Sequence, residues 1–135
     1  MAERTLMMIK PDAVAQNVIG EIIKQVESKG FKVVEIQMMR LTRAQAAAFY
    51  AVHREQPFYN GLLDFMTSGP AVPVVLERED AVRILREVVG TTNPAEAAEK
   101  TIRKAFGSNV RENAVHASDS PENGAVETAF FFGES

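Results

Sequence analysis

The feature that most restricts the fold of this chain is an alternation of short apolar segments with amphipathic segments of helical length. Four segments have the length and composition of strands: 4–10, 31–40, 71–77 and 114–118. Between and after them lie segments with helical spacing of apolar residues: the one that ends at Gly30, then 43–52, 58–67, 80–90 and the segment after Ser120-Pro121. Glycine and proline separate most of these elements, so their order is well marked.

This order predicts an α+β protein of the ferredoxin-like βαββαβ type, a four-stranded antiparallel sheet with helices packed on one face. Residues 100–113 have a weaker pattern, which predicts one helical turn and an ordered loop. Pro73 has no N–H to donate, and taken alone it predicts an edge strand or a bulge. In the last helix, Val126, Ala129 and Phe130 share a face.

Composition limits the class of protein. The 135 residues predict a single domain spanning 1–135, and the net charge of −3 argues against bulk electrostatic binding to nucleic acid or membranes. The chain has no cysteine, which excludes disulfides and thiolate metal sites and fits a reducing compartment. The first residues lack the apolar run of a signal peptide or membrane span. We therefore expect a soluble, cytoplasmic protein.

Candidate functional residues stand at the ends of the predicted elements. The phosphate-binding motifs GxxxxGK[ST] and GxGxxG are absent, as are HExxH and DxDxDG metal spacings. The candidates are Lys10, Arg86, Thr92, Arg103, Asn113 and His116. If the lysine and the arginines converged, they would suit a polyphosphate, because guanidinium groups match phosphate oxygens bidentately.

Each candidate also has an ordinary structural interpretation. Lys10 would be a solvated strand end, and the arginines would be surface residues paired with nearby carboxylates. Phe58 would be a core residue, and His53 would be a solvated residue at a helix end. A lone His116 in a polar turn would be structural. Residue patterns alone leave these alternatives open.

Five blocks of sequence, in order, resemble the nucleoside diphosphate kinase family, of bacterial type. The blocks are MIKPDAV, FYAVHREQPFY, FMTSGP, GTTNPAEAAEKTIR and NAVHASDS. The resemblance covers nearly the whole chain and is most specific in the last block.

The resemblance implies a ping-pong phosphoryl transfer from a nucleoside triphosphate such as ATP to a nucleoside diphosphate, which maintains NTP and dNTP pools. His116 would be the nucleophile, phosphorylated on its pros nitrogen, with Glu127 orienting it and Ser118 beside it. A neutral imidazole is a competent nucleophile at pH 7, and a covalent intermediate divides the reaction into two half-reactions.

The same resemblance implies roles for the other candidates. Tyr50 and Lys10 would lie near the transferring phosphate, and Arg86, Thr92 and Arg103 would hold the phosphates. Lys10 and Asn113 would bind the ribose, while Phe58 would stack on the base, with Leu62 and Val110 as apolar neighbours. Mg²⁺ would bridge phosphate oxygens without a direct protein ligand.

The sequence departs from the family pattern at five positions. Ala117 and Lys100 stand where glycine is usual, Ala105 replaces an aspartate and Gln56 replaces an arginine. Pro73 falls in a strand that the family places inside the sheet, so a bulge or a missing ladder bond is expected there.

Two other functions are compatible with some of these residues. A regulatory nucleotide-binding module would need Phe58, Arg86 and Arg103 but neither His116 nor Glu127. A nucleic-acid-binding protein is disfavoured by the acidic balance. The resemblance also implies a homo-oligomer, and the ending FFFGES favours a tetramer over a hexamer or dimer.

Overall fold

The computed structural model describes residues 2–133. Its strands are β1 (Ala2–Ile9), β2 (Lys32–Ile36), β3 (Val72–Glu79) and β4 (Val115–Ala117). Its α-helices are α1 (Pro11–Ala15), α2 (Ile19–Ser28), α3 (Arg43–Phe49), α4 (Tyr59–Met66), α5 (Ala81–Val89), α6 (Ile102–Phe106) and α7 (Pro121–Phe132). Two 3₁₀ turns, η1 (Ala51–His53) and η2 (Pro94–Glu96), complete the described elements.

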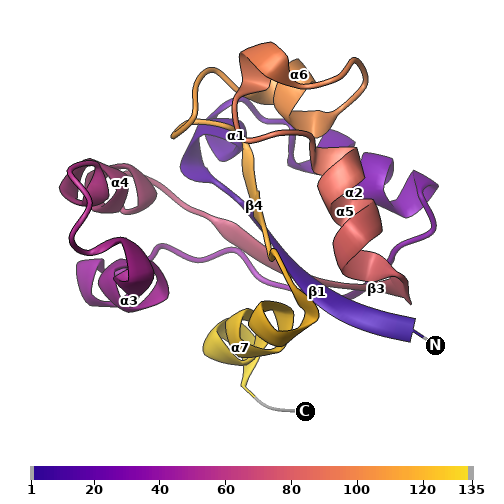
Figure 1. Ribbon diagram of the computed structural model, residues 1–135, viewed down its shortest axis with the longest axis horizontal. Coiled ribbons are helices and arrows are strands. Elements are labelled where there is room, and N and C mark those ends of the chain that lie inside the picture. The colour runs from indigo at the N-terminus through magenta and orange to yellow at the C-terminus, as the bar shows by residue number, and fades with distance from the viewer. Residues whose placement is uncertain (1, 134–135) are drawn as a thin grey trace.

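The strands form one antiparallel sheet in the order β2-β3-β1-β4 (Figure 1). This is the sheet that the βαββαβ prediction requires, with β1 and β3 at the centre. β4 lies at an edge and pairs only with β1, placing His116 opposite Met8. On its other side, β4 pairs with no strand among residues 2–133.

Helices cover both faces of the sheet, whereas the sequence pattern placed them on one face. On one face, α2 and α5 pack against Met7 and Ile9 of β1. On the other face, α3 and α4 pack around Met8, and α7 lies along β1 (Figure 1). The run from Thr5 to Ile9 is buried throughout because both of its faces meet helices.

Pro73 lies inside the sheet, so the edge-strand prediction made from this residue alone is wrong. Gln37 N–H donates to the Pro73 carbonyl at 3.2 Å, but Pro73 has no N–H to return. β2 ends at Ile36, and within residues 2–133 the segment after it pairs with the segment before β3 through the Met39–Ala71 bridge. The expected missing ladder bond is therefore confirmed.

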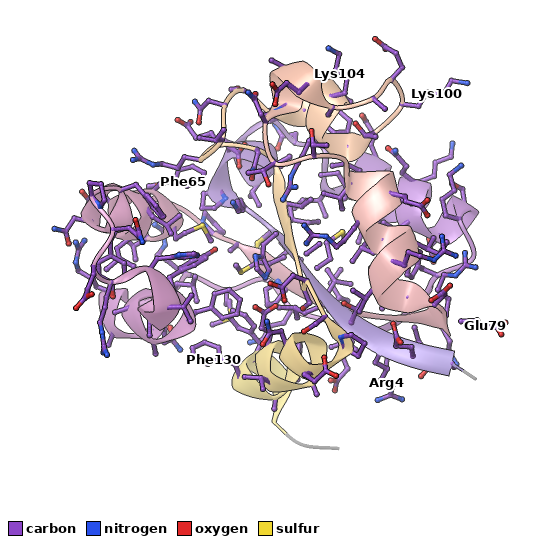
Figure 2. The ribbon with its side chains drawn as sticks, viewed as in Figure 1. Arg4, Phe65, Glu79, Lys100, Lys104 and Phe130 are labelled. Atoms are coloured by element: carbon purple, nitrogen blue, oxygen red, sulfur yellow. The ribbon has the colours of Figure 1, made fainter. Side chains whose placement is uncertain are left out.

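The two positions at which the resemblance implied glycine differ in backbone conformation. Lys100 has φ of 71°, a left-handed conformation that costs a residue with a Cβ. Its side chain points away from the body of the protein near α6 (Figure 2). Ala117 lies in β4 opposite Met7. Its φ is not positive, so its backbone does not require glycine.

The last helix packs differently from its sequence pattern. The buried residue of α7 is Gly124, where an added Cβ would lie 3.4 Å from the Arg4 carbonyl. Val126 and Phe130 remain 67% and 40% exposed. Among residues 2–133, no helix combines the length and apolar character that a membrane crossing requires.

Candidate active site

A cleft of about 1050 Å³ lies between β4, α3, α4, α7 and the loop before β4. It brings together residues that stand far apart in the sequence. The predicted site residues that line it are Lys10, Tyr50, Phe58, Leu62, Arg86, Thr92, Arg103, Val110, Asn113, His116 and Glu127. Ser118 does not line the cleft, but its hydroxyl donates a hydrogen bond to Glu127, which does.

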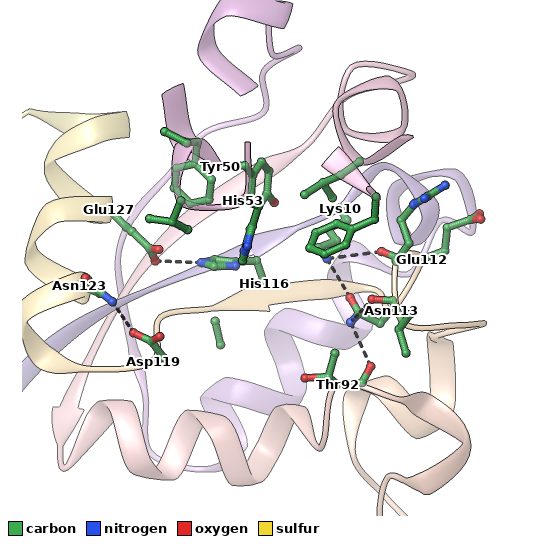
Figure 3. Close-up of a pocket in the computed structure, with 18 of the residues that line it drawn as sticks. Lys10, Tyr50, His53, Thr92, Glu112, Asn113, His116, Asp119, Asn123 and Glu127 are labelled. Carbon is green, nitrogen blue, oxygen red and sulfur yellow. Dashed lines mark hydrogen bonds and ion pairs between the residues drawn. The ribbon is translucent and has the colours of Figure 1, made fainter. Parts of the chain in front are cut away.

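His116 occupies the middle of the cleft, with Glu127 on one side and Asn113 on the other (Figure 3). Its Nε2 lies 2.8 Å from Oε1 of Glu127, and Ser118 Oγ donates to the same oxygen at 2.6 Å. A carboxylate can only accept, so Nε2 carries the ring proton. In the neutral imidazole, the other ring nitrogen, Nδ1, then keeps its lone pair.

The position at which α7 begins determines where Glu127 lies relative to His116. Ser120 caps this helix, its hydroxyl accepting from Asn123 N–H at 3.1 Å, and Pro121 follows as the first helical residue. Glu127 then lies in the second turn. Gly124 allows the helix to approach β1 closely, which brings the carboxylate within reach of the β4 histidine.

Aromatic rings enclose the histidine on the α3 side. The Phe49 ring lies 5.2 Å and the Tyr50 ring 6.4 Å from the imidazole, both edge-on. The Tyr50 hydroxyl is buried and has no hydrogen-bond partner among the described residues. Burial, followed by the charge of Glu127, raises the pKa of Tyr50 above its usual range. Tyr50 thus remains a neutral phenol with an unused donor.

Lys10 directly follows β1 and is 7% exposed. Its Nζ donates to Asn113 Oδ1 at 2.9 Å and to the Arg111 carbonyl at 3.4 Å. Burial, with a smaller contribution from the charge of Arg103, lowers the pKa of Lys10 to about 8, while Asp12 opposes the shift. An ammonium in this position lacks a carboxylate within ion-pair distance among the described residues, and it can serve an anionic ligand.

The segment between Asn113 and His116 has a strained backbone that hydrogen bonds hold in place. Ala114 has φ of 75°, which is costly for a residue with a Cβ. Its N–H donates to Asp12 Oδ2 at 3.0 Å, and its carbonyl accepts from Lys10 N–H at 2.9 Å. These bonds hold the start of β4 against the end of β1.

The two arginines converge although they stand on different helices. Arg103 Nη1 and Nη2 donate to the carbonyls of Gly90 and Val115, both at 2.9 Å, so its fork joins the end of α5 to β4. Arg86 Nη1 donates to the Ala117 carbonyl at 3.4 Å. Burial, followed by the charge of Arg86, lowers the pKa of Arg103 to about 10. Two cations held this close would bind a polyanion.

Asn113 connects Lys10 to the backbone at Thr92 and Val110. Its Nδ2 donates to the Thr92 and Val110 carbonyls, both at 3.1 Å, while its Oδ1 accepts from Lys10. At the mouth of the cleft, Phe58 and Val110 are 44% and 60% exposed. Exposed apolar surface on both sides of a cleft suits a flat aromatic ligand.

Sequence reasoning missed some of the residues that line the cleft. His53, interpreted as a solvated helix-end residue, is half-buried and its ring lies 5.4 Å from that of Phe58. Phe49, Arg111 and Asp119 also line the cleft. No periodicity or spacing marks them, because the folded arrangement of η1, β4 and the loop brings them to this place.

The described residues contain no group of three or more histidine or acidic side chains that could hold a metal ion. The carboxylates that line the cleft are Glu112, Asp119 and Glu127. Glu127 is engaged by His116 and Ser118, and hydrogen bonding from Asn123 is the largest cause of the lowered pKa of Asp119.

The chain is similar to known proteins over nearly its whole length. The sequence model of the family described as nucleoside diphosphate kinase matches residues 3–135. A nucleoside diphosphate kinase from Persephonella marina is 55% identical over 130 residues, covering 96% of this chain and 93% of that protein. Its counterpart from Halorhodospira halophila is 57% identical over 130 residues, covering 96% and 92%.

Solved structures of such enzymes share the fold. The nucleoside diphosphate kinase of Aquifex aeolicus has a TM-score of 0.95 and 44% identity, covering 98% of this chain and 96% of that one. The Halobacterium salinarum enzyme, solved in complex with CDP, has a TM-score of 0.95 and 39% identity, with 99% and 90% covered. With family match, sequence identity and fold in agreement over nearly its whole length, this chain belongs to the nucleoside diphosphate kinase family, and it transfers phosphate between nucleoside triphosphates and diphosphates.

Proposed function

We propose that His116 carries the phosphoryl group between the two nucleotides as a covalent phosphohistidine. The observation that supports this most directly is the 2.8 Å contact between its Nε2 and Glu127. That contact holds the proton on Nε2 and directs the Nδ1 lone pair to the reaction. Glu127 and Ser118 act through the histidine as positioning residues.

In the first half-reaction, Nδ1 attacks the γ-phosphorus of the nucleoside triphosphate. The N–P bond forms while the bond from phosphorus to the β–γ bridging oxygen breaks, and the diphosphate leaves with that electron pair. In the second half-reaction, the terminal phosphate oxygen of another diphosphate attacks phosphorus and the N–P bond breaks. Donor and acceptor use the same cleft in turn, which gives ping-pong kinetics.

Arg86, Arg103 and Lys10 neutralise the phosphates, and Thr92 adds a hydroxyl beside them. Since the transition state spreads charge over the equatorial oxygens of the transferring group, fixed donors are more effective than water. Tyr50 offers its unpartnered hydroxyl to the same group. The contacts of Arg103 with two backbone carbonyls hold its guanidinium in place before the nucleotide arrives.

Lys10 and Asn113 also bind the ribose hydroxyls, which places the base against Phe58, with Leu62 and Val110 as apolar neighbours. Stacking tolerates every base because each has a π-face. The relative from Halobacterium salinarum that was solved with CDP supports occupancy of this kind of cleft by a pyrimidine nucleotide.

Mg²⁺ is the cofactor we propose, bound mainly by the nucleotide phosphates. The cleft fits an ion of this kind, because Mg²⁺ keeps several waters and needs few protein ligands, and the carboxylate of Asp119 lines the cleft. Asp119 is the carboxylate near Arg86 and His116 that could hold it through water. When bound, the ion neutralises charge on the phosphate oxygens.

We further propose that residues 1–135 act as one catalytic domain, in the cytoplasm, within a homo-oligomer in which a tetramer is favoured. Ile36 and Met38, which are 49% and 56% exposed, offer apolar surface for such contacts. Sedimentation equilibrium would measure the assembly.

Labelling tests the mechanism. Incubation with γ-labelled ATP should give acid-labile, base-stable label on the protein, released by any nucleoside diphosphate. His116→Gln should take up no label while still binding ADP in calorimetry. Label at wild-type level in this variant would remove His116 from the reaction.

A further inference from the structure

We propose that Arg111 reads the edge of the nucleobase and gives this enzyme a preference for bases with a keto group there, guanine and uracil, over adenine and cytosine. This rests on the proposed placement of the base against Phe58. It adds one polar contact to an otherwise base-tolerant cleft.

The first observation is the position of the guanidinium group. A Cβ built on Gly61 of α4 would lie 2.6 Å from Nη2, 2.9 Å from Cζ and 3.0 Å from Nη1 of Arg111. The guanidinium therefore crosses from the loop before β4 to the helix that carries Leu62. A side chain at position 61 would displace the guanidinium from this place, whereas glycine leaves the space open.

The second observation is that the donors of this guanidinium are unused. Among residues 2–133, none accepts a hydrogen bond from it or forms an ion pair with it. The arginines that bind phosphate are different, since Arg103 and Arg86 both donate to backbone carbonyls. Arg111 thus has all five donors available to a ligand.

The third observation is that the backbone of Arg111 is held while its side chain is exposed. Its N–H donates to Asn109 Oδ1 at 3.0 Å, and its carbonyl accepts from Lys10 Nζ at 3.4 Å. Asn113 fixes the same loop by donating to the Val110 carbonyl. The starting point of the side chain is therefore defined relative to the ribose-binding residues.

These positions determine which part of the nucleotide meets Arg111. Lys10 and Asn113 are buried and sit at the inner end of the cleft, beside His116 (Figure 3). A ribose held there directs the base outward between Phe58 and Val110. The base edge remote from the sugar then faces the mouth, where the guanidinium lies.

The chemistry of that edge gives the preference. Guanine offers O6 and N7 to a guanidinium fork, and uracil offers O4. Adenine and cytosine place an amino donor in the equivalent position, which cannot accept from arginine. Glu112 also lines the cleft, and its carboxylate would favour the amino bases, so the measured preference reports which of the two side chains faces the base.

The experiment compares Arg111→Ala with wild type, using dissociation constants for GDP, ADP, UDP and CDP from calorimetry. We expect wild type to bind the keto nucleotides about three- to tenfold more tightly than the amino ones, and the ratio to fall to about one in Arg111→Ala, the low end of arginine-to-base discrimination because the site is open to water. Arg54→Ala is the matched control, since Arg54 is exposed and does not line the cleft. It should leave the ratio unchanged.

Gly61→Ala provides a second test without loss of charge. Its Cβ would displace the guanidinium, while alanine strengthens the helix. A reduced ratio in this variant supports the proposal. An unchanged ratio in Arg111→Ala, or equal weakening of all four nucleotides, would overturn it. Binding is measured without phosphoryl transfer, so failure of His116 to take up label would refute the proposed function separately.

Discussion

Replacing Glu127 by glutamine tests the geometry of the His116 site most directly. The amide oxygen of glutamine can still accept from Nε2 at 2.8 Å and from Ser118 Oγ at 2.6 Å, so the ring should keep its orientation. What is lost is the negative charge. That charge counts most as the imidazole becomes positive during attack on phosphorus.

The size of the effect follows from the type of hydrogen bond. A bond to a charged partner contributes about 1.5–3 kcal/mol and a neutral one about 0.5–1.5 kcal/mol, so the change removes about 1–1.5 kcal/mol. The side chains of His116 and Glu127 are only 22% and 20% exposed, so solvent screens little of this. Phosphorylation of His116 should therefore slow about five- to tenfold.

A quench-flow measurement of the first half-reaction gives this rate and the dissociation constant of ATP separately. The rate should fall while the dissociation constant changes less than twofold, because Glu127 is proposed to act through His116 and not on the nucleotide. Glu122→Gln on the same helix, where Glu122 is exposed, is the control and should be unaffected. A wild-type rate in Glu127→Gln, or a loss confined to ATP affinity, would refute the reasoning.

Three further predictions follow from the same structure. Because the pKa of Lys10 is lowered to about 8, its ammonium is charged below that pH and lost above it, so kcat/KM should fall above about pH 8, and Lys10→Arg should remove this fall. Arg103→Lys keeps the charge but loses the planar fork that spans the Gly90 and Val115 carbonyls, so steady-state kinetics should show kcat/KM lowered by about ten- to a thousandfold, and a value near wild type would exclude Arg103 from the site. Lys100→Gly should raise the free energy of unfolding in urea by about 0.5–1 kcal/mol because φ is 71° there, whereas Lys104→Gly within α6 should lower it by about 1 kcal/mol; destabilisation by Lys100→Gly would contradict the strain.

Much of the fold follows from local patterns in the chain. The strand segments and the helices after them differ in apolar spacing, and capping residues mark several boundaries. Thr42 and Gln45 form the capping box expected from their spacing, with both bonds present. Ser120 and Pro121 begin α7 as predicted. Such signals act within a few residues, so a sequence displays them directly.

Other features were decided by partners distant in the chain. Pro73 alone predicts an edge strand, but β3 is central. The proline is tolerated there because β2 ends at Ile36 and makes no ladder bond that requires the N–H of Pro73. The helices α3, α4 and α7 were predicted, but their position on the second face of the sheet was not, because a fully apolar strand does not reveal what covers each side. His53 and Arg111 gained a place in the cleft only when η1 and the β4 loop came together.

The element order, the family resemblance and the residues that could carry chemistry can be recognised before any fold is known, because propensity, capping and motif spacing are local properties of the chain. That Lys10, Arg86, Arg103 and His116 line one cleft, and that Nε2 of the histidine faces Glu127, became apparent from the folded arrangement. Distances between residues far apart in sequence depend on how sheet and helices pack, and no local pattern encodes them.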